Sequence, residues 1–400
     1  MNLRYLVVPF LLVVFLLTSC DQSSTESDES TDTSSTDKVE KATVSSIKID
    51  QKANSRAEIF AAMPLEDTTH FGRILAMPAV KKHYTDSDTG WRYLDRTYLT
   101  PLRKWRDEEI KDMNKKGNTL FYPFSGPDFL NAYTLFPDCD NYIMLGLEKV
   151  GELPDGFAEK DEPYVNNYLS NIRNALEDIF KRNYFITSYM GSDLYRVSKG
   201  VLPIINVFLA RTNNEIVGIH RLVLDEAGKP SLQALDKPVN DKDSTVTGLA
   251  IEFKNEKKDY TQWIYYFGMD ASDEGLANKQ EIDVFFRSFP SKVAYLKSAS
   301  YILFNPNFML IKNVIMEDVE AVLQDDTGVR YRDYVEAGNW NIQLYGNYAT
   351  PIRDFGSYTH QPTLRRAYQE NKQDVKRLGF PYGYQWRDTE KVSLLVCRKK

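Results

Sequence analysis

The sequence predicts an α/β body built on a mixed sheet, and three patterns support this fold class. Residues 119–148 have the pattern strand, helix, strand, with apolar runs at both ends and Ser-Gly-Pro-Asp between them. A long helical period follows Pro163. Residues 246–254 and 261–269 are two strand-like runs that Asn-Glu-Lys-Lys-Asp joins, which predicts an antiparallel hairpin. Parallel and antiparallel pairs are therefore expected in one sheet.

The stretch over residues 119–148 is expected to form a βαβ unit at the centre of this sheet. Ser125 or Gly126 would cap a short helix, with Pro127 at its first position. The helix would end before Pro137, since proline cannot continue it, and a second strand would follow. The connection is long enough for a right-handed crossover between parallel strands.

The first turn of this unit is a candidate ligand site. Ligands collect at the carboxyl ends of strands in such units, here around Ser125, Gly126, Asp128 and Glu148. Glu148 follows Gly126 by about 20 residues, where an acid binds ribose in a Rossmann domain, so the turn resembles the start of a nucleotide-binding fold. One glycine stands where that fingerprint has three, and Pro127 removes an amide. A capped core helix between two core strands is the alternative interpretation.

Other elements extend the pattern on both sides of the unit. The chain before it is helical but irregular, and the helix after Pro163 runs over residues 165–180. Residues 308–322 have the spacing of a late helix. Further strands are expected at three places, residues 215–224, 340–348 and 392–397. The first of these three has apolar residues on both faces, which predicts a central position.

The first residues have the composition of a secretory signal, with one positive charge before a long apolar run. The run ends in Leu17-Thr18-Ser19-Cys20, which closely resembles the bacterial lipobox. The resemblance implies that residues 1–19 are a signal peptide and that the mature chain begins at a diacylated Cys20. Acyl chains on this cysteine would hold the protein in a membrane. An ordinary signal peptide is the alternative.

Residues 20–46 are expected to form a disordered tether behind the lipid. They are rich in Ser, Thr, Asp and Glu and almost without apolar side chains. The acids of this segment carry most of the formal charge of −6, which leaves residues 47–400 at about −2. A body so nearly balanced gives no indication of a nucleic-acid partner. Acids soon after the lipid cysteine resemble the export signals of surface lipoproteins in Bacteroidetes-type bacteria.

The predicted location is the cell envelope, with a lipid anchor in the outer membrane and a body that faces the periplasm or the surface. Residues 47–400 would form one large globular body. The polar stretch over residues 225–244 could divide it into two, or could be a long hairpin loop.

Two aspartates near the C-terminal end of the late helix are candidates for function. Asp325 and Asp326 would lie where the negative end of the helix dipole disfavours acids. A locally disfavoured choice can mark a functional site. The alternative is that the helix ends earlier and that Asp-Asp-Thr-Gly is a solvated turn.

The strand over residues 340–348 provides a second candidate surface. Its alternation places Asn341, Gln343 and Tyr345 on one face and apolar side chains on the other. Amides beside tyrosine suit the hydroxyls and apolar faces of a glycan. A plain solvent-facing surface is the alternative.

Common catalytic motifs are absent from the sequence, including G-x-S-x-G, H-E-x-x-H, C-x-x-C and the P-loop. The four histidines are scattered and are expected to be structural. The Asp-Ser-Asp-Thr-Gly run at residues 86–90 resembles the opening of a calcium loop but lacks the later ligands, so no metal is expected. Cys139 and Cys397 could pair in an oxidising envelope or could stay free.

These observations favour an envelope lipoprotein that binds or scaffolds, with a glycan or another envelope protein as partner and no cofactor. The alternative is an envelope hydrolase with carboxylate chemistry at Asp128, Asp325 or Asp326, because carboxylates are the only plentiful catalytic groups. A Rossmann-like transferase is a third hypothesis. It is less favoured because nucleotide-linked cofactors are not normally available outside the inner membrane.

Overall fold

The structure is a computed structural model, and the residues it describes are 47–65, 68–185, 194, 197–235, 246–348 and 357–400. The predicted leader and tether, with Cys20, lie outside these ranges. The described residues belong to one compact unit, Ile47–Lys400. Of the polar stretch over residues 225–244, the turn after residue 224 joins two antiparallel strands in a hairpin, and residues 236–244 lie outside the described ranges.

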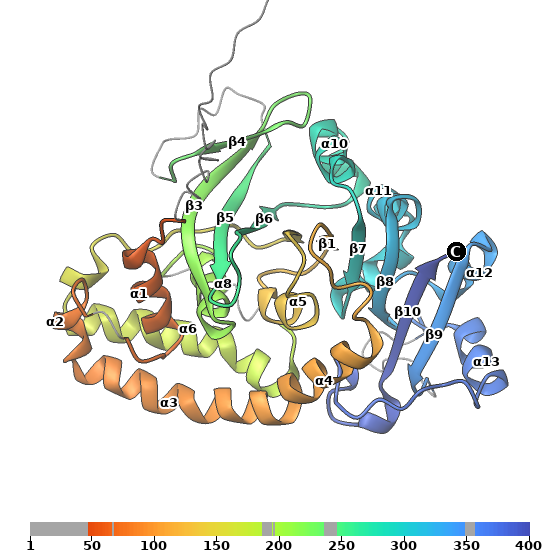
Figure 1. The fold of residues 1–400 in the computed structure, drawn as a ribbon, viewed down its shortest axis with the longest axis horizontal. Helices are drawn as coiled ribbons and strands as arrows, with labels where there is room; N and C mark the ends of the chain where they lie inside the picture. The colour runs from red at the N-terminus through yellow and green to blue at the C-terminus, as the bar shows by residue number, and fades with distance from the viewer. Residues whose placement is uncertain (1–46, 66–67, 186–193, 195–196, 236–245, 349–356) are drawn as a thin grey trace, which may run out of the picture. The chain divides into compact units, whose positions relative to one another are not determined.

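The body is organised around a ten-stranded sheet with the order β4-β3-β5-β6-β2-β1-β7-β8-β10-β9 (Figure 1). Its five middle strands, from β6 to β8, are parallel, and antiparallel strands flank them on both sides. The predicted α/β class with a mixed sheet is therefore confirmed. The strands are β1 Thr119–Tyr122, β2 Asn141–Gly146, β3 Asn214–Leu224, β4 Pro230–Gln233, β5 Thr247–Asn255, β6 Gln262–Gly268, β7 Lys292–Leu296, β8 Val319–Asp325, β9 Trp340–Gly346 and β10 Ser393–Lys399.

Helices cover both faces of the sheet, and alternate residues of each strand face opposite cores. Leu120 and Tyr122 of β1 pack into the core beneath helices α1 to α8, whereas Phe121 packs into the core beneath α9 to α13. Both faces of the central strands are buried, which explains their continuous apolar runs. The helices are α1 Gln51–Phe60, α2 Gly72–Leu75, α3 Pro78–Leu94, α4 Thr100–Glu109, α5 Phe129–Leu135, α6 Glu162–Arg182, α8 Leu202–Arg211, α9 Asp273–Leu276, α10 Gln280–Ser288, α11 Met309–Asn313, α12 Tyr331–Ala337 and α13 Pro362–Glu370.

The central unit is a parallel β1 and β2 pair with α5 between them, as predicted. The predicted helix cap is wrong, because Asp128 is the N-cap and its carboxylate accepts the Asn131 amide at 3.2 Å. Ser125 lies three residues before the cap position, and its hydroxyl donates to the carbonyls of Gly126 and Leu145. The helix therefore begins two residues later than the proline signal indicates.

The prediction of a late helix over residues 308–322 is wrong in its second half. Helix α11 continues into a π-helical turn, η5 Val314–Asp318, and β8 begins at Val319. Val319 and Val322 are fully buried, and β8 pairs with β7 and β10. Pairing within the sheet outweighs the helical spacing here, since β-branched residues pack well in strands.

The flanking elements are largely as predicted. Helix α6 covers the predicted helical period, and β5 and β6 form the antiparallel hairpin. Strand β3 is second from the edge of the sheet, not central. Both faces of β3 are apolar for a different reason than a central position, since α8 packs on one face and α10 on the other.

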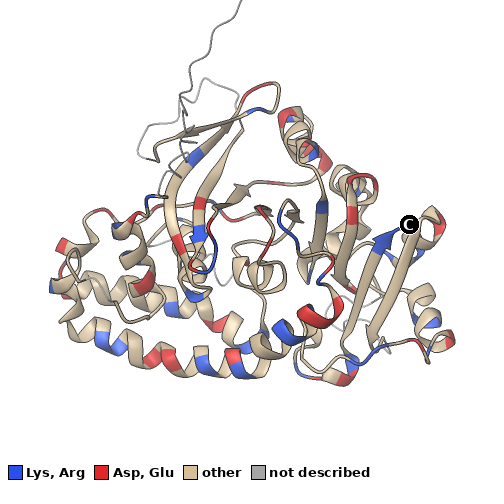
Figure 2. Ribbon diagram, viewed as in Figure 1, with Lys and Arg blue, Asp and Glu red and all other residues tan. Residues whose placement is uncertain are grey.

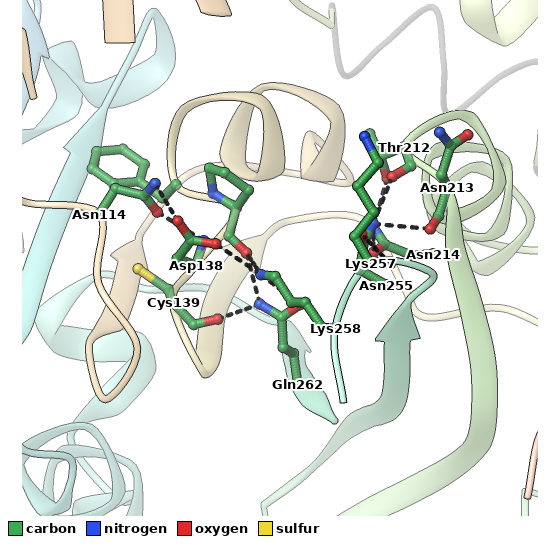
Figure 3. A network of polar contacts seen from close by, with 12 residues as sticks. Asn114, Asp138, Cys139, Thr212, Asn213, Asn214, Asn255, Lys257, Lys258 and Gln262 are labelled. Carbon is green, nitrogen blue, oxygen red and sulfur yellow. Dashed lines mark hydrogen bonds and ion pairs between the residues drawn. The ribbon is translucent and has the colours of Figure 1, made fainter. Parts of the chain in front are cut away.

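A network of hydrogen bonds and an ion pair connects the amino ends of β2 and β6 (Figure 3). The Gln262 amide donates to the carbonyls of Pro137 and Cys139, at 2.8 and 2.6 Å. The Lys258 ammonium lies 3.1 Å from the Asp138 carboxylate.

Cys139 and Cys397 are both buried free thiols, in the cores on opposite faces of the sheet. The disulfide considered from the sequence is therefore absent, and burial raises the pKa of both thiols.

Charges of both signs are interspersed over the helices, and they alternate along α3 (Figure 2). The aspartates of the run that resembles a calcium loop lie on α3. Asp86 pairs with Lys82 at 2.8 Å, and Asp88 pairs with Arg92 at 2.5 Å. In the described part of the chain, no helix is long and apolar enough to cross a bilayer.

Candidate functional site

A cavity of about 310 Å³ opens at the carboxyl ends of the middle strands. The chain places β1, β2 and β6 outward on one side and then crosses to β7 and β8 on the other, so the strand order reverses beside β1. In open α/β sheets, ligands bind in the crevice at this switch point. The turns after four different strands supply its walls, with Gly126, Glu148, Asp270 and Lys297 among their residues.

Three glycines allow the strand ends to approach one another around this cavity. A Cβ atom on Gly146 would lie 2.8 Å from the Cα atom of Gly126 and 2.6 Å from a carboxylate oxygen of Glu148. A Cβ atom on Gly268 would lie 2.4 Å from the Glu148 carbonyl oxygen. Gly126 also has a φ of +51°, which favours glycine. Glycines at the ends of three strands therefore make this close approach possible.

The Glu148 carboxylate lies over Gly126 and faces the cavity. A Cβ atom on Gly126 would be 3.3 Å from its Oε2 atom. The Tyr266 hydroxyl donates to the Glu148 carbonyl at 2.7 Å and fixes the backbone of the turn. Within the described ranges, no hydrogen bond or ion pair engages the carboxylate itself. No described residue therefore competes with a hydroxyl donor for its two oxygens.

A buried ion pair forms another part of the wall. The Lys297 ammonium lies 3.3 Å from the Asp128 carboxylate, with side chains 1% and 4% exposed. Lys297 also donates to the Asn183 carbonyl, and the Tyr122 hydroxyl donates to Asp128 at 3.0 Å. Burial lowers the pKa of Lys297, and the nearby charge of Asp128 opposes that shift. The pair joins the turn after β1 to the turn after β7 and to the end of α6.

The two late aspartates do not share the cavity with Asp128. They lie at the carboxyl end of β8 rather than at a helix end, so the dipole argument does not apply. The Asp325 carboxylate accepts the backbone amides of Ser298 and Thr327, at 3.0 and 2.9 Å. Burial raises the pKa of Asp325, and burial with the charge of Asp325 raises the pKa of Asp326 to about 7. The charge of Asp325 also acts on Lys297, but neither late aspartate is among the residues that line the cavity.

The predicted polar face of β9 is partly covered and does not line the cavity. Tyr345 is buried against Trp105 of α4, with ring centroids 5.2 Å apart, and its hydroxyl donates to Glu109 at 2.8 Å. The Gln343 amide donates to the Asp374 carbonyl at 2.8 Å, and Asn341 is exposed. An open sugar-binding face is therefore not formed, because α4 packs where solvent was expected.

Several lining residues gave no signal of a binding site in the sequence. Lys297 follows β7, whose five residues are too few to show a period. Phe308 comes from a short 3₁₀ turn and packs edge to face on Phe124, with centroids 5.8 Å apart. Asp270 follows β6, and its position beside the cavity depends on β6 pairing with β2.

Comparison of the chain with family models, with curated proteins and with solved structures finds no match. Numbered along the chain, the five parallel strands have the order 3-2-1-4-5, which matches the first five strands of the doubly wound order 3-2-1-4-5-6. The cleft lies at the switch point of that sheet, with an acid after the second strand.

Proposed function

We propose that the folded body binds a nucleoside-type ligand through its ribose diol. One observation carries this proposal: the unpaired Glu148 carboxylate, among the described residues, faces the switch-point cavity over Gly126. In doubly wound sheets an acid at the end of the second strand accepts the ribose hydroxyls. Hydrogen bonds to a charged acceptor contribute about 1.5 to 3 kcal/mol each, enough to determine ligand orientation.

The rest of the cavity suits the base of such a ligand. Apolar and aromatic walls come from Phe124, Met269, Ile302 and Phe308. Aromatic rings and apolar side chains pack against the flat face of a base, and a few polar groups then fix its orientation. The volume of about 310 Å³ is in the range of small-molecule sites. A monosaccharide also carries adjacent hydroxyls, so the glycan hypothesis remains one arm of the test.

Replacing Glu148 with Gln is expected to weaken adenosine binding by about 10- to 100-fold, because an amide accepts hydroxyl protons less strongly than a carboxylate. Titration calorimetry on the purified protein measures this change. Wild-type protein should also bind 2′-deoxyadenosine and 3′-deoxyadenosine more weakly than adenosine. The matched control is Glu152→Gln, since Glu152 lies outside this cavity and pairs with Lys199 at the surface. Equal affinity for adenosine and both deoxy analogues would contradict the proposal, and binding of a hexose alone would assign the cavity to sugars.

We also propose that a lipid on Cys20 holds this body in the cell envelope, with the membrane as its partner. The support is the lipobox-like tetrapeptide after an apolar run. The Cys20→Ser variant is expected to lose membrane association, because the rest of the sequence has no other long apolar segment. Detergent partitioning and a salt wash of the membrane pellet measure it. Cys139→Ser is the control, and a Cys20→Ser protein that stays in the washed pellet would contradict the anchor.

A further inference from the structure

We propose that the ligand carries no phosphate and that Asp128 sets this specificity. The inference rests on the proposed nucleoside site and names the ligand class within it. In doubly wound sheets a pyrophosphate sits at the start of the helix after the first strand, where backbone amides and the helix dipole bind it. In this protein, backbone carbonyls and the Asp128 carboxylate already accept the hydrogen bonds that the amides at the start of α5 could offer to a phosphate.

The amides at the start of α5 are engaged in the structure. Residue 127 is proline and has no amide hydrogen. The amides of Gly126 and Asp128 donate to the carbonyls of Leu145 and Ser125, at 3.1 and 3.3 Å. The Asn131 amide donates to the Asp128 carboxylate at 3.2 Å. A phosphate at this turn would find a negative side chain in the position that it needs.

The positive charge of the cavity lining, on Lys297, is also paired within the protein. Lys297 is the one cation among the described residues that line the cavity, and its side chain is 1% exposed. It pairs with Asp128 at 3.3 Å and donates to the Asn183 carbonyl. Its charge is therefore balanced within the wall and is not offered to a ligand.

The remaining charges of the lining favour the same ligand class. Glu148 and the exposed Asp270 carry two negative charges, and the described lining holds no free cation to offset them. Two phosphate charges placed beside them would be repelled, whereas a neutral or positively charged nucleoside would not. The geometry thus points to ligands such as adenosine or a sulfonium nucleoside rather than to NAD or a nucleoside diphosphate.

The test compares ligands that share the adenosine moiety and differ in the 5′ substituent and its charge. Calorimetry of the whole protein with adenosine, AMP, ADP and S-adenosylmethionine is expected to show AMP and ADP at least about tenfold weaker than adenosine. The affinity for the cationic sulfonium should fall as salt rises, because the cleft attracts it electrostatically. AMP or ADP that binds as tightly as adenosine overturns the inference and leaves the proposed diol site standing. A protein that binds none of the four overturns both.

One substitution tests the charge argument without disturbing the buried pair. Asp270→Asn is expected to raise the affinity for AMP several-fold more than the affinity for adenosine, since it removes a negative charge from the lining while its amide still accepts the Ser272 backbone proton. Glu226→Gln is the matched control, because Glu226 is an exposed acid in the turn between β3 and β4, away from the lining. No gain for AMP in Asp270→Asn, or an equal gain in the control, would contradict the charge argument.

Discussion

Asp128→Asn is expected to lower the free energy of unfolding by about 3 to 5 kcal/mol, because it removes the carboxylate that is paired with a buried lysine. The Lys297 side chain is 1% exposed, and its ammonium lies 3.3 Å from the Asp128 carboxylate. An ordinary acid at a helix start contributes only about 0.3 to 1 kcal/mol through the dipole. Urea unfolding of the purified variant measures the difference and separates these two roles.

A double variant separates the contribution of the ion pair to stability from the contribution of the helix cap. Asp128→Asn combined with Lys297→Met removes both charges and keeps similar volume, so much of the lost stability should return. The control is Asp161→Asn, since Asp161 caps α6 in the same way, through the Tyr164 amide at 3.0 Å, in an exposed position. Its cost should stay below about 1 kcal/mol. An Asp128→Asn protein no less stable than the control would show that Asp128 is only a cap.

Phe121→Ala is expected to cost about 3 to 5 kcal/mol, because it leaves a cavity in the middle of the sheet. Phe121 is fully buried on β1 and contacts Phe286 of α10, with ring centroids 5.2 Å apart. Ile143→Ala, at the paired position on β2, should cost about 2 to 5 kcal/mol. Denaturant unfolding measures both losses.

The matched control for Phe121 is Tyr93→Ala on α3. Tyr93 is 54% exposed, so its loss should change stability by no more than about 0.5 kcal/mol. Small losses at both Phe121 and Ile143 would show that β1 and β2 are not the energetic centre of the body. Equal losses at Phe121 and Tyr93 would contradict the burial argument.

The central unit could be predicted because its signals are local. Apolar runs, a proline before a short helix and a second proline after it are properties of neighbouring residues, and they identify β1, α5 and β2. The same signals placed Gly126, Asp128 and Glu148 at strand ends, where the structure has a cavity. The helix cap was missed because the helix begins at Phe129, two residues after the proline, so Asp128 rather than Ser125 stands at the cap position.

The interpretations that fail depend on partners far away in the chain. β8 has helical spacing in its sequence and becomes a strand because β7 and β10 pair with it. Tyr345 was expected on an open face and is buried because α4 covers it. A single sequence contains the side chains of these contacts but not the arrangement of elements that brings them together.

The sequence by itself determined the α/β class, the βαβ unit, the antiparallel hairpin and the acid after the second strand, because each depends on residue type and short-range period. Tertiary structure alone decided how the candidate site is composed. Lys297 reaches Asp128 only because β7 lies beside β1, across the point where the strand order reverses. That pairing places a lysine and an aspartate, 169 positions apart in the sequence, in one buried ion pair. The free energy of such a contact depends on burial and distance, which arise only when the sheet is assembled.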